Sequence, residues 1–314
     1  MIKKYDAYYD STDGKSNIHV NIWRDESVSP VGMIQIIHGV AEHIGRYEKF
    51  AEYFVKNGFV VFGNDQIGHG KSVEMMTQLG DFGEEDDDIR LVDDVNLLNR
   101  IMRKKYPEIP CYVLGIDMGS LVARIFASDF PHKVNGLILC SVLYGDEPIS
   151  IFEPFLSPIG SVLGKDNLVN APFKTFGLIS SRFLKENDDN AYISRSVQNR
   201  DEYDSDPLCG FPITYGSLTT IAKLMSKCSS RFFYQSFPLN IPVLIIGGAN
   251  DPVGFFGRDA VNLANKLENR HIKVEVRQYP GLRHDILNED DPEFIYEDIS
   301  KWIKASSKKE NTGM

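Results

Sequence analysis

The chain has 314 residues, and its 34 Lys and Arg against 44 Asp and Glu give a formal net charge of −10 at neutral pH. A hydrophobic content of 42% and a charged content of 25% are typical of globular proteins and exclude wholesale disorder. The acidic balance argues against a protein that binds nucleic acid or an anionic membrane surface. No apolar run approaches the roughly 20 residues that span a bilayer, and the first residues lack the apolar region of a secretory signal. We therefore expect a cytoplasmic protein.

Short apolar runs alternate along the chain with longer amphipathic ones, which predicts an α/β fold with a mostly parallel sheet flanked by helices. Strands are expected at 5–9, 17–24, 32–37, 58–62, 111–114, 134–140, 241–246 and 273–279. Helices are expected at 46–56, 84–105, 118–128, 257–268 and 292–304. The first two strands flank the turn Asp13-Gly14 and predict an antiparallel hairpin at one edge of the sheet.

Between 145 and 231 the composition changes, because prolines interrupt segments rich in Phe, Leu and Ile and the strand pattern disappears. We interpret this region as a helical cap inserted into a core formed by 1–144 and 232–314. The apolar residues of the cap are expected mainly to fill its own core, with a minority facing a ligand. The polar tail 305–314 is predicted to fray.

In an open α/β sheet, functional residues gather at the carboxyl ends of the strands. The central strand is followed by Gly115-Ile-Asp-Met-Gly119, whose two glycines permit the sharp strand-to-helix turn of a nucleophile elbow. An acid, Asp251, and a histidine, His284, follow the last two strands. This is the order of nucleophile, acid and base in the α/β-hydrolases.

Four longer motifs make the resemblance specific: HGxxEHxxRY at 38–47, DxxGHGxS at 65–72, DPVG at 251–254 and RHxxLNE at 283–289. Over residues 10–304 the chain resembles the monoacylglycerol lipases and lysophospholipases of the α/β-hydrolase superfamily. The resemblance implies a cofactor-free esterase that acts on a small ester or a single-chain lipid and contacts a membrane at most peripherally, through the cap. It also implies that the backbone N–H groups of Val40 and Met118 form an oxyanion hole and that Asp251 orients His284, which acts as base and then as acid.

One residue departs from this family. Its elbow reads GHSMG, with serine as the nucleophile, whereas this chain has Asp117 at that position. Attack by a carboxylate on an ester gives an adduct that must expel an alkoxide, with a conjugate-acid pKa of about 16, in preference to a carboxylate with a pKa of about 4. The difference is on the order of 16 kcal/mol, and general acid catalysis offsets only part of it. We therefore predict very low ester turnover, together with an ion pair between Asp117 and His284.

Two other interpretations of Asp117 stay open. The chain could be a lipid-binding or small-ligand-binding protein without activity, whose serine was lost naturally or replaced. Alternatively, G-x-D-x-G is similar to the elbow of haloalkane dehalogenases and epoxide hydrolases, in which an aspartate attacks carbon. Against this stand Met118, where those families typically carry Trp, and the lack of their HGxP motif after the first parallel strand.

The remaining polar motifs predict structural roles. The spacing of His43, His69 and His284 matches no zinc pattern, so we predict no metal site. Asp65 and His69 are expected to hold the loop after the second parallel strand together. Cys111, Cys140, Cys209 and Cys228 lie far apart without a C-x-x-C pair and are expected to be reduced structural thiols.

Overall fold

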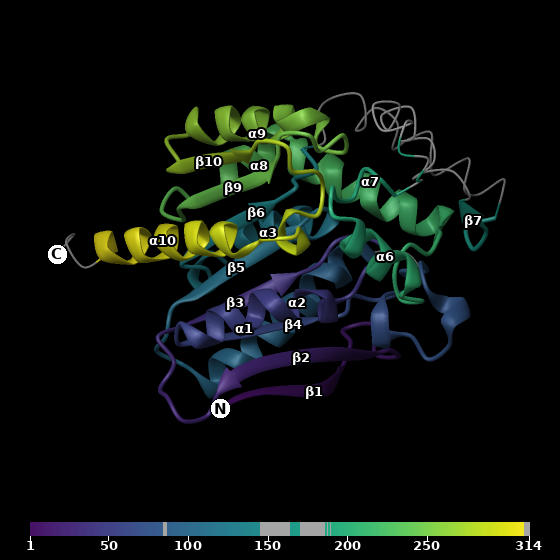
Figure 1. Ribbon diagram of the computed structural model, residues 1–314, viewed down its shortest axis with the longest axis horizontal. Helices are drawn as coiled ribbons and strands as arrows, with labels where there is room; N and C mark the ends of the chain where they lie inside the picture. Colours follow the sequence, from purple (N-terminus) through teal and green to yellow (C-terminus); the bar gives the residue numbers. More distant parts are fainter. Residues whose placement is uncertain (84–86, 145–163, 170–185, 187, 189, 311–314) are drawn as a thin grey trace.

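The main sheet of the computed structural model has eight strands. The structure describes residues 1–83, 87–144, 164–169, 186, 188 and 190–310. The strands of this sheet are β1 (Ile2–Asp10), β2 (Asn17–Asp25), β3 (Gly32–Ile37), β4 (Phe59–Asn64), β5 (Cys111–Ile116), β6 (Gly136–Cys140), β9 (Val243–Gly248) and β10 (Val274–Tyr279). They lie in the order β1-β2-β4-β3-β5-β6-β9-β10 (Figure 1).

Only the first edge of the sheet is antiparallel. β1 pairs with β2, and β2 with β4, in opposite directions, and every other neighbouring pair is parallel. The predicted edge hairpin and the predicted mostly parallel sheet are both confirmed. A parallel sheet brings the carboxyl ends of its strands to one edge of the structure, where ligands usually bind.

Helices cover both faces of the sheet, as a parallel sheet requires. They are α1 (Glu48–Lys56), α2 (Asp87–Lys105), α3 (Met118–Asp129), α9 (Arg258–Glu268) and α10 (Glu293–Glu310). Side chains of β5 alternate between the two layers: Tyr112 and Leu114 join the cluster under α1 and α10, whereas Val113 joins the cluster under α3 and α9. The period-two alternation of a strand thus supplies two hydrophobic layers from one continuous apolar run.

The C-terminal helix is longer than the sequence suggested. The prediction that fraying starts at residue 305 is wrong, because α10 continues to Glu310. Ser306 is buried, and the hydroxyl groups of Ser307 and Tyr112 lie 2.5 Å apart, so contacts with the core extend the helix. Residues 311–314 lie outside the described residues.

Between β6 and β9 the described residues form β7 (Leu168–Val169), α6 (Val197–Ser205), β8 (Ile213–Thr214), α7 (Tyr215–Ser229) and α8 (Arg231–Ser236). In Figure 1, α6, α7 and β7 lie together at the end of the molecule away from the C-terminus. The predicted boundary between 231 and 232 falls at the start of α8. Residues 145–163 and 170–185, which include most of the apolar residues expected in the cap, lie outside the described residues. None of the helices in the described ranges combines the length and apolarity that a membrane span requires.

A buried carboxylate joins the edge hairpin to two loops at the carboxyl edge. Asp65 accepts hydrogen bonds from the amides of Ile44 and Lys71, both at 2.8 Å, and lies 2.8 Å from Nδ1 of His19. Nε2 of His19 lies 2.9 Å from Asp6. His69 Nδ1 lies 2.9 Å from the carbonyl of Ile67, so Asp65 and His69 both hold this loop, as expected, but through separate contacts. The histidine that contacts the Asp65 carboxylate is His19, which lies in β2, the strand that crosses this loop.

Both ring nitrogens of His19 face carboxylate oxygens, so the ring fits this site as an imidazolium. Burial opposes that charge, but Asp65 and Asp6 outweigh it and raise the pKa of His19. When folding raises the pKa of a histidine, the protonated histidine contributes to the free energy of unfolding. This contribution is complete below the unfolded pKa of about 6.5 and is lost as the pH rises through the folded pKa.

We therefore expect the destabilisation caused by His19→Gln to be largest near pH 6 and to shrink toward pH 9. Urea unfolding of both proteins across this range measures the difference in the free energy of unfolding. His132→Gln, at an exposed histidine, is the control and should leave the pH dependence unchanged. A His19→Gln effect that stays constant from pH 6 to 9 would contradict the imidazolium assignment.

Candidate active site

The turn between β5 and α3 places Asp117 in a conformation that few residues adopt. Its φ is 50° and its ψ is −120°. A Cβ atom on Gly119 would lie 2.1 Å from the carbonyl oxygen of Ile37, and one on Gly115 would lie 2.4 Å from the carbonyl oxygen of Gly119. Glycine is therefore required on both sides of Asp117, and aspartate is among the side chains that tolerate a positive φ.

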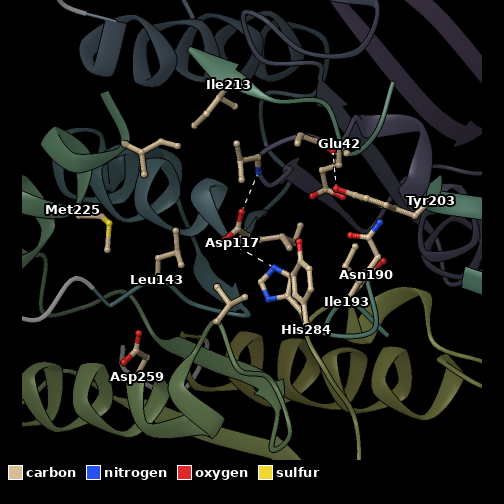
Figure 2. A pocket seen from close by; sticks show the side chains of 18 of the residues that line it. Glu42, Asp117, Leu143, Asn190, Ile193, Tyr203, Ile213, Met225, Asp259 and His284 are labelled. Atoms are coloured by element: carbon tan, nitrogen blue, oxygen red, sulfur yellow. Dashed lines mark hydrogen bonds and ion pairs between the residues drawn. The ribbon is translucent and has the colours of Figure 1, made fainter. Parts of the chain in front are cut away.

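The Asp117 carboxylate is 6% exposed and faces two different groups. Oδ2 accepts a hydrogen bond of 3.0 Å from the backbone N–H of Val40, and the N–H of Met118 also favours the charged carboxylate. Oδ1 lies 3.9 Å from Nε2 of His284 (Figure 2). The backbone donors expected for an oxyanion hole therefore contact the side chain of residue 117 itself.

His284 connects this carboxylate to a second one. Nδ1 of His284 lies 3.1 Å from Oδ2 of Asp251, in the loop after β9. Asp251 is 2% exposed, and its Oδ1 accepts a hydrogen bond of 2.9 Å from the amide of Val253. The structure thus brings together all five residues that the sequence singled out: Val40, Asp117, Met118, Asp251 and His284.

The charges of this cluster depend on one another. Burial raises the pKa of Asp117, whereas His284 and the amides of Val40 and Met118 stabilise its carboxylate. Burial disfavours the charged form of His284, but Asp251 and Asp117 outweigh that effect and raise its pKa to about 10. At neutral pH the histidine is therefore an imidazolium between two carboxylates and holds no lone pair at Nε2 to accept a proton.

The loop that carries Val40 is held by a buried polar network. Glu42 accepts hydrogen bonds from the amide of Gly39 and from the hydroxyl group of Tyr47, the latter at 2.7 Å. Arg46 lies between the carboxylates of Glu42 and Asp285. Because Asp285 follows His284 directly, Arg46 links the loop of the backbone donor to the loop of the histidine. The sequence motifs contained Arg46 and Asp285 but did not indicate that they pair.

A cavity of about 470 Å³ opens beside Asp117 and His284. Figure 2 shows Glu42, Asn190 and Tyr203 on one side of the pair, and Leu143, Met225 and Ile213 on the other. The apolar wall is formed largely by one face of α7, through Leu218, Ile221, Ala222 and Met225. Ile193 also lies near Asn190, and Asp259 lies on the side of Leu143 and Met225, so the lining mixes polar and apolar groups with a continuous apolar stretch on α7. The volume suits a small molecule. Nothing in the sequence of α7 distinguishes it from any other amphipathic helix, so its role in the cavity could not be predicted.

His43, Asp206 and Cys209 place three possible metal-ligand atoms within 4.8 Å of one another. Nε2 of His43 lies 2.8 Å from Asp206, and Nδ1 accepts a hydrogen bond from the amide of Gly45. A metal bound at Nε2 would require a proton at Nδ1, facing that N–H group. The hydrogen bonds therefore favour a structural role, in which His43 joins the loop of Val40 to the chain before β8.

Comparisons with known proteins find relatives that align with most of the chain. Residues 28–291 match the family model described as serine aminopeptidase, S33. The chain is 27% identical to a monoacylglycerol lipase of Mycolicibacterium smegmatis, over 92% of this chain and 94% of that protein. It is 26% identical to the monoglyceride lipase of Homo sapiens, over 88% of this chain and 83% of that protein. The crystal structure of a thermostable carboxyl esterase from Bacillus coagulans superimposes with a TM-score of 0.89 at 27% identity, covering 96% of this chain and 98% of that one.

Replacing Asp117 by Asn removes one of the two nearest negative charges from His284 while keeping the shape of the side chain. We expect the pKa of His284, about 10 in the unaltered protein, to fall in Asp117→Asn. A titration of the imidazole resonances followed by ¹H–¹⁵N NMR measures it. Asp259→Asn, at the far side of the cavity (Figure 2), is the control and should leave His284 unchanged. An equal pKa in Asp117→Asn and the unaltered protein would mean that Asp117 does not form the ion pair.

Proposed function

The chain belongs to the serine aminopeptidase (S33) family and is a hydrolase of the carboxylesterase lineage, of the monoglyceride lipase type; from this we propose that its cavity receives an ester of a single acyl chain, such as a monoacylglycerol, or a smaller ester. Residue 117 stands at the nucleophile position and His284 at that of the base, with Asp251 orienting the histidine. The N–H groups of Val40 and Met118 stand where a developing oxyanion would be stabilised. The apolar wall on α7 suits the acyl chain, and the polar side near Asn190 and Tyr203 suits the alcohol.

Asp117 makes this site a poor catalyst of ester hydrolysis. The observation that carries this conclusion is the 3.0 Å hydrogen bond from the Val40 N–H to Oδ2 of Asp117, because it occupies a donor that the reaction needs for the oxyanion. The imidazolium form of His284 cannot act as a base, and collapse of an adduct with the carboxylate returns the starting ester. We propose that the protein binds its ester and turns it over very slowly. A ligand-binding protein without any turnover is the limiting case.

A second reaction is compatible with the same carboxylate. Oδ1 of Asp117 faces Nε2 of His284 at 3.9 Å, while Oδ2 accepts the hydrogen bond from the Val40 N–H, so the oxygen nearer the histidine is the one placed to attack. In an attack of Oδ1 on the carbon of an epoxide, a C–O bond forms, the ring C–O bond breaks, and the new alkoxide takes the proton of the His284 imidazolium. The alkyl ester has no charge at residue 117, and His284 is now neutral, so it can activate water for hydrolysis of the ester.

The first experiment compares ester hydrolysis by the unaltered chain, Asp117→Ser and Asp117→Asn, with short p-nitrophenyl esters and a monoacylglycerol as substrates. Asp117→Ser supplies a nucleophile and frees His284, so we expect its kcat/KM to exceed that of the unaltered chain by at least about 10³-fold. Asp117→Asn also removes the charge but supplies no hydroxyl group, and should stay inactive. A serine variant no faster than the asparagine variant would refute the ester-hydrolase proposal for these substrates.

The second experiment tests attack on carbon. Intact-mass spectrometry of the unaltered chain after incubation with styrene oxide should show an adduct equal in mass to one epoxide, located by peptide mapping at Asp117. His284→Gln removes both the proton donor for ring opening and the base for hydrolysis, so its adduct should form more slowly but persist once formed. Asp117→Asn is the control and should form none. If no adduct forms on either Asp117-containing protein, the carboxylate is not a nucleophile toward epoxides.

A further inference from the structure

The loop that carries His284 is paired with a segment of the insertion. The backbone N–H of His284 donates to the carbonyl of Tyr192 at 3.3 Å, and that of Asp285 donates to the carbonyl of Ile193 at 2.7 Å. The guanidinium of Arg283 donates to the carbonyl groups of Ala191 and Ser194. Residues 191–194 therefore run alongside 283–285 and bind them through backbone carbonyl groups, although neither segment is a strand.

Glu289, at the other end of the loop that carries His284, contacts the same part of the insertion. Its carboxylate accepts hydrogen bonds from the hydroxyl group of Ser194 at 2.8 Å and from the amides of Arg195 and Ser196, both at 3.2 Å. Glu289 is 3% exposed and Ser194 is 0% exposed. A buried carboxylate is costly unless its lone pairs are used, and here residues 194–196 of the insertion supply the nearest donors.

The core holds the opposite side of the loop. The hydroxyl group of Ser141, directly after β6, donates to the carbonyl of His284, and the amide of Asn250 donates to the carbonyl of Leu282 at 2.9 Å. A Cβ atom on Gly248 would lie 2.0 Å from the carbonyl oxygen of Arg283, so β9 also presses directly against the loop. The backbone of His284 is therefore fixed between the core on one side and the insertion on the other.

We propose that Glu289 is a positioning residue for His284, acting through the hydrogen bonds that tie 194–196 of the insertion to the histidine loop. The segment 191–196 is then a fixed part of the active site. The expected effect of Glu289 on catalysis rests on the function proposed above, whereas its expected effect on the position of His284 does not. Displacement of a catalytic group by about 1 Å can reduce a rate by about 100-fold, so a small shift of the loop is measurable.

The first test uses the unaltered chain and Glu289→Gln and needs no activity. Glutamine has a single acceptor oxygen, and its amide N–H₂ would face the donors of 194–196. We expect the weakened link to loosen the contact of His284 with Asp251 and to lower the pKa of the imidazole, measured by ¹H–¹⁵N NMR, by about one unit, a tenfold loss of proton affinity. Ser194→Ala removes one donor only and should give a smaller shift in the same direction.

The second test combines Glu289→Gln, and separately Ser194→Ala, with Asp117→Ser and measures ester hydrolysis. If Glu289 positions the histidine, kcat should fall at least about tenfold with KM changed less than about twofold, because substrate binding does not use Nε2 of His284. Ser230→Ala is the matched control: it removes a serine hydrogen bond of the same insertion, at the start of α8, that does not reach the histidine loop. It should lower thermal stability without changing kcat or the pKa of His284.

Unchanged pKa and kcat in a folded Glu289→Gln would overturn the proposal, and so would equal effects of Ser230→Ala. If Glu289→Gln does not fold, Ser194→Ala decides by the same two readouts. If Asp117→Ser proves inactive toward esters, the proposed function fails, and the NMR comparison still supports or refutes the positioning role.

Discussion

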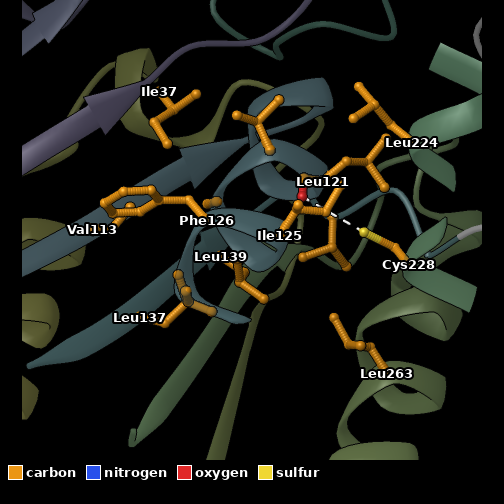
Figure 3. Close-up of a cluster of buried hydrophobic side chains, with 14 of the residues drawn as sticks. Ile37, Val113, Leu121, Ile125, Phe126, Leu137, Leu139, Leu224, Cys228 and Leu263 are labelled. Carbon is orange, nitrogen blue, oxygen red and sulfur yellow. Dashed lines mark hydrogen bonds between the residues drawn. The ribbon is translucent and has the colours of Figure 1, made fainter. Parts of the chain in front are cut away.

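The arrangement of the site depends on the close contact between α3 and β3 at Gly119. The absence of a side chain there allows the first turn of α3 to lie against the carbonyl of Ile37, and this contact fixes both the turn at Asp117 and the distance to Val40. Behind the turn, α3 is buried on nearly all sides: Figure 3 shows Leu121, Ile125 and Phe126 between the central strands and the residues Leu224 and Cys228 of α7. The hydrophobic packing of the whole helix holds the strained φ of a single residue.

Because the fold fixes the donors, the proposed chemistry of the site depends above all on the side chain at position 117. The N–H groups of Val40 and Met118 stabilise the negative charge of Asp117, and under the proposed function they would stabilise charge that develops on a substrate in the same way. The Asp117 carboxylate is stabilised by these N–H groups already in the protein without substrate, and its charge also helps to hold His284 as an imidazolium. An arrangement suited to a transient oxyanion thus becomes a resting ion pair without any change of the backbone.

The sequence predicted what depends on local pattern and on chain order. The strands and most helix boundaries followed from apolar periodicity. Chain order and the motifs singled out Asp117, Asp251 and His284, the family resemblance implied Val40 and Met118, and the fold brings these five residues together. Pairings between distant residues outside the predicted site did not follow. His19 rather than His69 lies against Asp65 because β2 crosses the loop, and Ser307 reaches Tyr112 to extend α10 across 195 residues of sequence. Such contacts depend on tertiary geometry and have no periodic signal.

The contacts of Glu289 belong to the same class, and they change how the insertion is understood. A cap is readily pictured as a separate layer that shapes a cavity above a complete catalytic centre. Here residues 191–196 supply carbonyl acceptors to Arg283, His284 and Asp285, and donors to Glu289, so the backbone N–H groups of His284 and Asp285 have these partners only when this part of the insertion is folded against the loop. Buried backbone N–H groups that lose such partners are costly. The histidine and the insertion are therefore expected to order together, and a substitution in 191–196 can disturb His284 without touching any residue that the sequence motifs identify.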